Sequence, residues 1–327
     1  MRQPRLVMLR ALGLGDLCTG VPAMRAVATA FPDFERVLAA PSWQAPIAQQ
    51  CGVSWITHTD RLTPLDTQLS GADVAIDLHG CGPESIRLLD DLFPRCLVAF
   101  RHDSVPSSHR GPEWDSADHE IDRWCRLLNH YGITTDRHDL GLRYSSDRQP
   151  AGTGDHIVVH PGAAAAGRRW PAPRFASVIA HLLDAGHRVV LTGSAGERAL
   201  CRQVYEMVTA SVPAGQERLV DLAGDTDLEQ LCAVIGSGRA VLSNDTGVAH
   251  LAVAFDVASV TLFGPTSPAL WGPPHDPKHR PIWKGRTGDP HATTRDPGLD
   301  AITVPEVIEQ LEQVLALRGC ETTHSGT

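Results

Sequence analysis

Long apolar segments and basic regions are both missing from this chain of 327 residues. No apolar run is long enough to span a membrane, and the run Leu6–Leu9 is shorter than the apolar region of a signal peptide. Acidic residues outnumber basic ones in both halves, and the formal net charge is −9. This balance argues against nucleic acid or an anionic membrane surface as a partner. The sequence therefore predicts a cytoplasmic globular protein without a transmembrane segment.

Motifs that hold metal ions are also missing. The eight cysteines form no C-x-x-C pair, and no His/Cys cluster has metal-ligand spacing, so buried reduced thiols are expected. Asp225-Thr226-Asp227 imitates a D-x-D metal motif. However, Thr226 and Glu229 also fit a helix capping box, and that explanation suffices. No metal site is predicted.

Short apolar runs alternate with helical patterns along the whole chain. The predicted strands are 6–9, 36–39, 73–78, 96–100, 157–160, 188–192, 240–242 and 259–263. The predicted helices are 19–30, 42–50, 121–131, 173–185, 197–208, 228–235 and 305–317. Such alternation is typical of parallel sheets that helices cover on both faces.

A polar stretch rich in Gly, Pro and Ser at 145–155 indicates a linker. We therefore predict an α/β protein with two Rossmann-like, doubly wound domains, 1–148 and 149–327, facing a central cleft where ligands bind. The terminal helix at 305–317 is a candidate to pack back toward the N-terminal domain. The segment 268–297, rich in Pro, Gly, His and Arg, is expected to be a long irregular connection.

The stretch 243–250, Ser-Asn-Asp-Thr-Gly-Val-Ala-His, lies between two apolar runs. It predicts a strand, a tight polar turn and a helix that begins at Thr246 and Gly247. Free backbone N–H groups and the positive end of the helix dipole make such a start an anion site. An ordinary cap on a buried helix explains the same residues equally well.

A second turn, Leu12-Gly13-Leu14-Gly15-Asp16, follows the first predicted strand. It lacks the third glycine of a dinucleotide-binding fingerprint, which argues against a Rossmann oxidoreductase. The glycines allow a sharp turn that holds Asp16 at the start of a helix, where the carboxylate can accept a proton from a hydroxyl. A simple N-cap is the competing interpretation.

Two further loops follow predicted strands in the second half. The loop 160–171 is rich in Gly and Ala and ends in Arg168, Arg169 and Trp170. Small residues would let phosphates approach the backbone and guanidinium groups would neutralise them, although a flexible loop with solvated arginines is equally simple. Glu197, in the loop 192–197, can accept hydrogen bonds from ribose hydroxyls or serve as a first-turn helix acid.

Taken in order, these segments resemble glycosyltransferase family 9, the ADP-heptose heptosyltransferases of inner-core lipopolysaccharide assembly. The resemblance covers nearly the whole chain. It rests on 14–16 with Pro22, 119–123, 160–162, 168–171, 222–224 with Leu228, 244–247 with His250, and 262–266.

The resemblance implies a GT-B fold and an inverting, metal-independent transfer, with the donor in the C-terminal domain and the acceptor in the N-terminal domain. By position it implies Asp16 as general base. It implies donor binding by a set of residues that comprises Gly15, Arg168, Glu197, Thr226, Asp245, Thr246, Gly247 and His250. Arg168 stands where the family usually has lysine, and the loop 163–166 offers only backbone amides to a phosphate.

The expected partners are a nucleotide-sugar donor, ADP-heptose foremost, and either a glycolipid acceptor or a small-molecule glycoside; no cofactor is expected, and the protein is expected to be a monomer. Arg101, His102, His109 and Arg110 lie in a loop that we assign to acceptor binding. The alternative function is a non-catalytic regulatory protein that binds a sugar nucleotide on the same scaffold.

Overall fold

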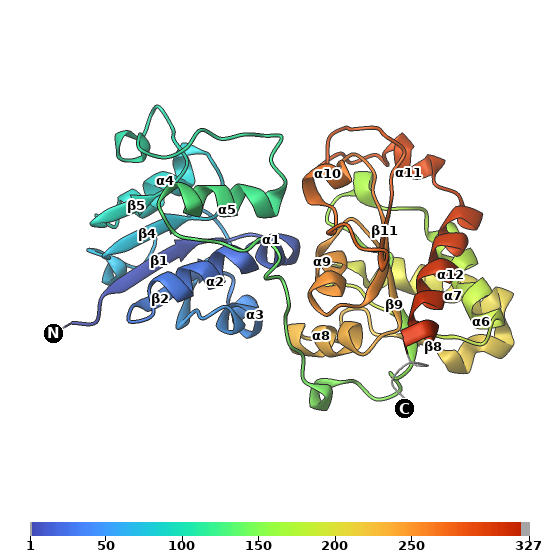
Figure 1. Cartoon of the computed structure of the whole chain (residues 1–327). Helices are drawn as coiled ribbons and strands as arrows, with labels where there is room; N and C mark the ends of the chain where they lie inside the picture. The colour runs from blue at the N-terminus through green and yellow to red at the C-terminus, as the bar shows by residue number, and fades with distance from the viewer. Residues whose placement is uncertain (1, 322–327) are drawn as a thin grey trace. The chain divides into compact units, whose positions relative to one another are not determined.

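The computed structural model describes residues 2–321 and divides into two compact units, one through Leu142 and one from Arg143 (Figure 1). The division lies slightly before the predicted linker because residues 143–148 belong to the second unit. There Tyr144 packs edge-on against Phe255, and Arg148 pairs with Asp227 at 2.7 Å.

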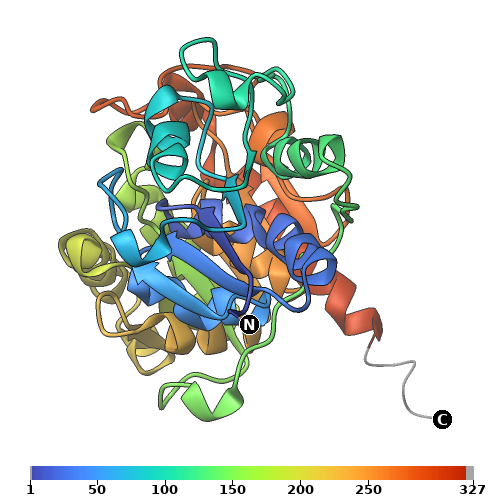
Figure 2. The ribbon, with the colours of Figure 1, turned by 90° about the vertical axis from the view of Figure 1, so that its left-hand side faces the viewer.

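The N-terminal unit, whose first strands are blue in Figure 2, contains a five-stranded parallel sheet in the order β3-β2-β1-β4-β5. Its strands are β1 Arg5–Leu9, β2 Glu35–Ala40, β3 Trp55–His58, β4 Val74–Asp77 and β5 Cys96–Val98. Its helices are α1 Leu14–Thr19, α2 Val21–Ala30, α3 Ala45–Gln50, α4 Pro83–Asp90 and α5 Glu120–His130. Helices α2 and α5 pack against each other.

The C-terminal unit contains a six-stranded parallel sheet in the order β11-β10-β9-β6-β7-β8. Its strands are β6 His156–His160, β7 Arg188–Leu191, β8 Leu219–Asp221, β9 Ala240–Asn244, β10 Ala258–Leu262 and β11 His279–Ile282. Its helices are α6 Ala172–Asp184, α7 Arg198–Ser211, α8 Leu228–Gly236, α9 Gly247–Ala254, α10 Pro268–Trp271, α11 Pro297–Ala301 and α12 Val304–Glu321.

Alternate residues of the second sheet form one core with apolar side chains of α6, α7 and α12. Helix α9 packs on β9 and β10, and α8 packs on α9. Helix α12 packs on α6 and on strands β9–β11, and its apolar side chains join the core of the C-terminal unit. The predicted fold class, α/β with two doubly wound parallel sheets, is confirmed.

The predicted irregular connection 268–297 is partly wrong, since it contains α10, strand β11 and the start of α11. Strand β11 includes Pro281 and pairs only with β10 in the sheet order. An edge strand tolerates a proline because one side of it donates no ladder hydrogen bonds. The proline concealed this strand from sequence patterning.

The predicted helix 19–30 is confirmed as α2, and a further short helix, α1, precedes it on the other side of Gly20. A Cβ atom at Gly20 would lie 2.8 Å from Arg10 Nε, so the break lets the chain pass close to a buried guanidinium. Most of the described cysteines are buried, whereas Cys81 is half-buried and Cys96 is exposed. Cys320 lies outside the side chains that the structure describes.

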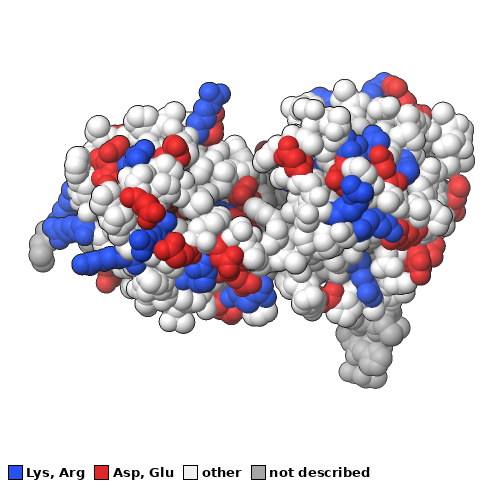
Figure 3. Space-filling view, turned by 90° about the horizontal axis from the view of Figure 1, so that it is seen from above, with Lys and Arg blue, Asp and Glu red and all other residues white. Residues whose placement is uncertain are grey.

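Within residues 2–321 no helix is both long and apolar enough to cross a membrane. On the face drawn in Figure 3, acidic and basic side chains are interspersed on each unit.

Candidate active site

The strand order of the C-terminal sheet reverses between β6 and β9, which pair with each other. The next strand after β6, β7, lies on one side of this pair, and the next strand after β9, β10, lies on the other. Ligands of open α/β sheets bind outside the carboxyl ends of the strands at such a reversal. The loop 161–171 follows β6, and Asp245 and Thr246 follow β9. The turn that the sequence singled out therefore lies at the position where this fold binds ligands.

Asn244, the last residue of β9, braces the loop that follows β6. Its Nδ2 donates to the carbonyls of Pro161 (2.8 Å) and Gly162 (3.1 Å), and its Oδ1 accepts from the backbone N–H of Trp170 (3.0 Å). The side chain is fully buried. Both ends of the loop are thus tied to one amide, which holds the loop rigidly over the sheet edge.

Thr246 occupies the N-cap position of α9, and the helix begins at Gly247 as predicted. Within the described chain the Thr246 side chain makes no capping hydrogen bond, so an ordinary side-chain cap does not explain this residue. The first-turn N–H groups have no partners inside the helix. His250 lies one turn later, with its ring 6.2 Å from that of Trp271.

Arg168 lies beside this helix start. Its Nη1 is 3.4 Å from the carbonyl oxygen of Asp245 and 3.9 Å from a carboxylate oxygen of the same residue. Its Nε is buried and has no hydrogen-bond partner among the described residues. The guanidinium therefore keeps donors available next to the amides of α9, and the two together suit a phosphate group.

Glu197 ends the short turn Ala195–Glu197 before α7. It accepts hydrogen bonds from the backbone N–H (2.7 Å) and hydroxyl (2.8 Å) of Ser194, as a first-turn acid does. Its carboxylate also faces the end of β6: its Oε2 is 3.9 Å from His160 Nε2, and a Cβ on Gly162 would collide with it. Glu197 therefore belongs to the same sheet edge as Arg168.

His160 is buried behind Glu197 and shares a 3.0 Å hydrogen bond with the Thr192 hydroxyl. Desolvation lowers the pKa of His160, and the nearby Glu197 carboxylate only partly opposes that shift. A neutral imidazole between two neighbouring strand ends provides a fixed hydrogen-bonding support for this edge.

The assignment of a capping box to Thr226 and Glu229 is wrong. The N-cap of α8 is Asp227, whose Oδ1 accepts from Gln230 N (2.8 Å), while Gln230 Oε1 accepts from Asp227 N (3.0 Å). Thr226 is left half-buried just before the helix. A box of Asp and Gln has the same spacing one residue later, and sequence alone did not separate the two registers.

Both aspartates of the D-x-D motif bind arginines. Asp225 pairs with Arg198 at 2.6 Å, and Asp227 pairs with Arg148 at 2.7 Å. Across the part of the chain that the structure describes, no group of three or more His, Cys, Asp or Glu side chains is arranged to hold a metal ion.

In the N-terminal unit the strand order reverses between β1 and β4. Asp16 lies in the first turn of α1 after β1, with Gly15 directly before it, so Gly15 belongs to a different unit from the other proposed donor residues. The Oδ2 of Asp16 accepts from the N–H of Gly13 at 3.1 Å. Burial raises the pKa of Asp16, while the positive charge of Arg10 opposes the shift.

Two residues that the sequence analysis did not select lie at the end of β4. His79 Nδ1 accepts from the Ala11 N–H at 3.2 Å, and desolvation lowers the pKa of His79 to about 4. Asp77 is fully buried and accepts from the Ser85 hydroxyl at 2.7 Å; its burial raises its pKa to about 6. The sequence signal that could have revealed Asp77 and His79 is their position at the end of a buried strand, where ligands bind in such sheets.

The four residues assigned to acceptor binding lie in the loop after β5, where Arg101 and His109 both contact Asp103. Arg101 pairs with Asp103 (3.5 Å) and Glu113 (3.3 Å), while His102 Nδ1 bonds Ser104 at 3.0 Å. His109 Nε2 lies 3.3 Å from the Asp103 carbonyl. The loop uses these side chains largely for its own hydrogen bonds, and Arg110 follows on its exposed surface.

Comparison with known proteins connects this geometry to one family. The model of glycosyltransferase family 9 (heptosyltransferase) matches residues 108–296, more than half of the chain. Lipopolysaccharide heptosyltransferase 2 of Salmonella typhimurium is 33% identical over 158 residues, which cover 46% of this chain and 44% of that protein. The matched stretch thus spans less than half of that relative.

The solved structures extend the likeness of fold to almost the entire chain. The E. coli ADP-heptose lps heptosyltransferase II matches with a TM-score of 0.79 at 21% identity, covering 96% of this chain and 99% of that one. The E. coli heptosyltransferase WaaC with ADP matches with a TM-score of 0.67 at 19% identity, covering 95% and 99%. The two α/β units therefore have the GT-B fold. Asp16 lies outside the stretch that the family model matches.

Proposed function

Because the chain belongs to glycosyltransferase family 9, we propose that it transfers heptose from ADP-heptose to a hydroxyl group of a lipopolysaccharide-core-like glycolipid. The observation that supports the donor half of this proposal is the cationic, amide-rich edge of the C-terminal sheet. There Arg168, with a buried Nε that lacks a partner among the described residues, adjoins the start of α9.

The donor diphosphate would lie on the backbone amides at Thr246 and Gly247 and on the Arg168 guanidinium. Helix N-terminal amides and guanidinium groups both stabilise anions, and fixed donors gain strength as negative charge develops on the leaving diphosphate. Glu197 would accept hydrogen bonds from the ribose hydroxyls. Thr226 and His250 would complete the donor contacts.

Asp16 would act as the general base on the acceptor. The acceptor oxygen attacks the anomeric carbon as the bond to the diphosphate breaks, the hydroxyl proton passes to Asp16, and ADP leaves with the bonding electrons. Attack opposite the leaving group inverts the anomeric configuration. A raised pKa favours this role, because a stronger base accepts a proton more readily.

We further propose that the transfer requires no metal ion and no cofactor. In that case Arg168 and the α9 amides carry the neutralising role that a divalent cation has in other sugar transferases. Treatment with EDTA should leave the rate of ADP release unchanged, and a loss of activity that Mg²⁺ or Mn²⁺ restores would contradict this part of the proposal.

The test of the proposed function is ADP release from ADP-heptose in the presence of a heptose-deficient core glycolipid. We expect Asp16→Asn to lower the rate by ~10²–10⁴, the usual contribution of a general base. The matched control is Asp33→Asn, at an exposed acid in the same unit, and it should act like the wild type. Thermal shift with ADP should show equal donor-side binding in all three proteins.

Three outcomes discriminate between functions. If ADP release requires a small glycoside instead of the glycolipid, the protein is a transferase with a different acceptor from the one proposed. Binding of ADP-heptose without release under any acceptor, with Asp16→Asn indistinguishable from the wild type, would favour a regulatory protein. The absence of both ADP-heptose binding and ADP release would contradict the proposal altogether.

A further inference from the structure

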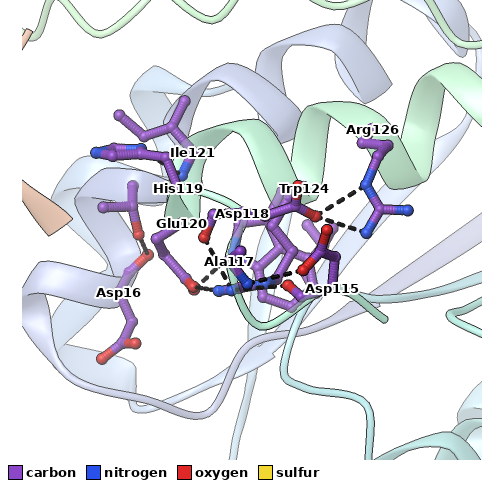
Figure 4. A network of polar contacts seen from close by, with 12 residues as sticks. Asp16, Asp115, Ala117, Asp118, His119, Glu120, Ile121, Trp124 and Arg126 are labelled. Atoms are coloured by element: carbon purple, nitrogen blue, oxygen red, sulfur yellow. Dashed lines mark hydrogen bonds and ion pairs between the residues drawn. The ribbon is translucent and has the colours of Figure 1, made fainter. Parts of the chain in front are cut away.

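A pair of buried opposite charges, Arg10 and Glu120, adjoins the turn that carries Asp16. Figure 4 shows one member of the pair, Glu120, with Asp16. Arg10, the residue after β1, is fully buried, and its Nη2 is 3.3 Å from Glu120 Oε1 at the start of α5. Glu120 is itself only 4% exposed. Charges this deep are costly unless their hydrogen bonds are satisfied.

Arg10 directs its donors at the turn that carries Asp16. Its Nε donates to the carbonyl oxygen of Asp16 at 2.6 Å, and its Nη2 donates to the Thr19 hydroxyl at 3.0 Å. Thr19 in turn donates to the same Asp16 carbonyl at 3.0 Å. The remaining Nη1 donates to the carbonyl of Leu78, which follows β4. One guanidinium therefore joins α1 to the ends of β1 and β4.

Glu120 holds that guanidinium in place. Its Oε1 accepts from Arg10 and, at 2.8 Å, from Trp124 Nε1, and its Oε2 accepts from Arg123 Nη1. The Arg10 guanidinium also lies 4.8 Å from the centre of the Trp124 ring. Three donors and a ring face fix the geometry of the pair.

Stability alone does not account for such a pair, since buried ion pairs are often replaceable by apolar residues without loss. The contacts of this pair converge on one functional turn instead. We infer that Arg10 and Glu120 are positioning residues for Asp16: Arg10 fixes the first turn of α1, and Glu120 holds the Arg10 guanidinium there and offsets its positive charge. This inference rests on the proposed function.

The electrostatics around Asp16 agree with this geometry. Burial is the main cause of its raised pKa; Arg10 from β1 opposes the shift, Glu120 from α5 adds to it, and hydrogen bonds from the backbone at Gly13 and Asp16 oppose it. His79, on the loop after β4, is held largely uncharged near neutral pH because desolvation lowers its pKa. Glu120 is thus the acidic side chain that offsets Arg10 at Asp16.

The first experiment follows the titration of Asp16 by carboxyl ¹³C NMR in the wild type, Glu120→Gln and Asp118→Asn, with Asp16→Asn to assign the signal. Glutamine keeps an oxygen for Arg10 and Trp124 and removes the charge. We expect the Asp16 titration to move to lower pH in Glu120→Gln. It should not move in Asp118→Asn, because that acid pairs with Arg126 at 2.6 Å. An unmoved titration in Glu120→Gln would overturn the inference, and this readout needs no substrate.

Transfer kinetics give the second readout. The acidic limb of the kcat/KM profile should move to lower pH in Glu120→Gln, with a plateau about 3-fold lower because the base is weaker. The proposed function stands if the wild type transfers heptose and Asp16→Asn does not. The inference fails, independently of that, if Glu120→Gln matches the wild type at every pH.

Thr19→Val keeps the test decisive should Glu120→Gln not fold. It removes the hydroxyl that joins Arg10 to the Asp16 carbonyl and preserves the side-chain shape. We expect kcat to fall about 10-fold through misplacement of the base, with an unchanged KM for the donor. Full kcat in a folded Thr19→Val protein would contradict the positioning role.

Discussion

Single side chains at the carboxyl ends of the two sheets owe their properties to burial. Asn244 makes three hydrogen bonds because it is enclosed by the loop that it braces. Asp16 and Asp77 have raised pKa values because desolvation disfavours their charged forms. In each case the residue type was visible in the sequence, whereas its environment arises from segments far away along the chain.

Asp77 supports a prediction about stability and pH. Burial raises its pKa from 3.8 to about 6, so the folded state binds this proton more tightly than the unfolded state. The stabilisation is complete below about pH 4 and disappears as the pH rises through 6. We expect the free energy of unfolding of the wild type, relative to Asp77→Asn, to fall by about 3 kcal/mol between pH 4 and pH 7.

Urea unfolding of both proteins across that pH range checks this expectation. His79 has the opposite dependence, since its lowered pKa costs stability as the pH falls from about 6.5 toward 4. That contribution is common to both proteins and cancels in the difference. A difference that stays constant with pH would show that Asp77 titrates normally in the folded protein.

At the scale of elements, predictions succeeded where the pattern was long and apolar and failed where one residue changed the backbone. The strands β1, β6, β7, β9 and β10 lie within or next to their predicted ranges. Short β3, β8 and β11 and helix α4 were missed, because three to eight residues carry little periodicity. The break at Gly20 depends on contact with Arg10, which no local pattern shows.

The start of α8 allows a direct test of the corrected capping assignment. Asp227→Ala removes the side chain that caps the helix and pairs with Arg148, so we expect a loss of about 1 kcal/mol in the free energy of unfolding. Thr226→Ala should change it by less than about 0.5 kcal/mol. Urea unfolding of both variants measures the two values, and the reverse order would restore the earlier assignment.

At the scale of the whole molecule, each unit has its own parallel sheet and its own buried cluster. The proposed donor contacts at Arg168, Glu197, Thr226, Thr246 and His250 all belong to the C-terminal unit. Binding of the donor should therefore not require the N-terminal unit, which carries the proposed base Asp16.

We predict that residues 143–327 alone fold and bind ADP with a Kd within about threefold of the intact chain, because domains of this size with their own core commonly fold independently. Isothermal titration calorimetry measures both affinities. Arg168→Ala in the same fragment should weaken binding at least tenfold if it removes a charge-assisted hydrogen bond to phosphate. A folded fragment that does not bind ADP would place essential donor contacts in the N-terminal unit.

The sequence by itself determined the fold class, the division into two α/β units and the family, because strand–helix alternation and ordered turn motifs are local and repeat along the chain. It also located Asp16, Arg168 and the turn at Thr246. Only the tertiary structure decided that Asn244 braces the loop after β6, that Asp227 caps α8, and that Arg10 and Glu120 meet behind Asp16. These depend on contacts between residues distant in sequence or on a register shift of one residue, and burial sets their energies.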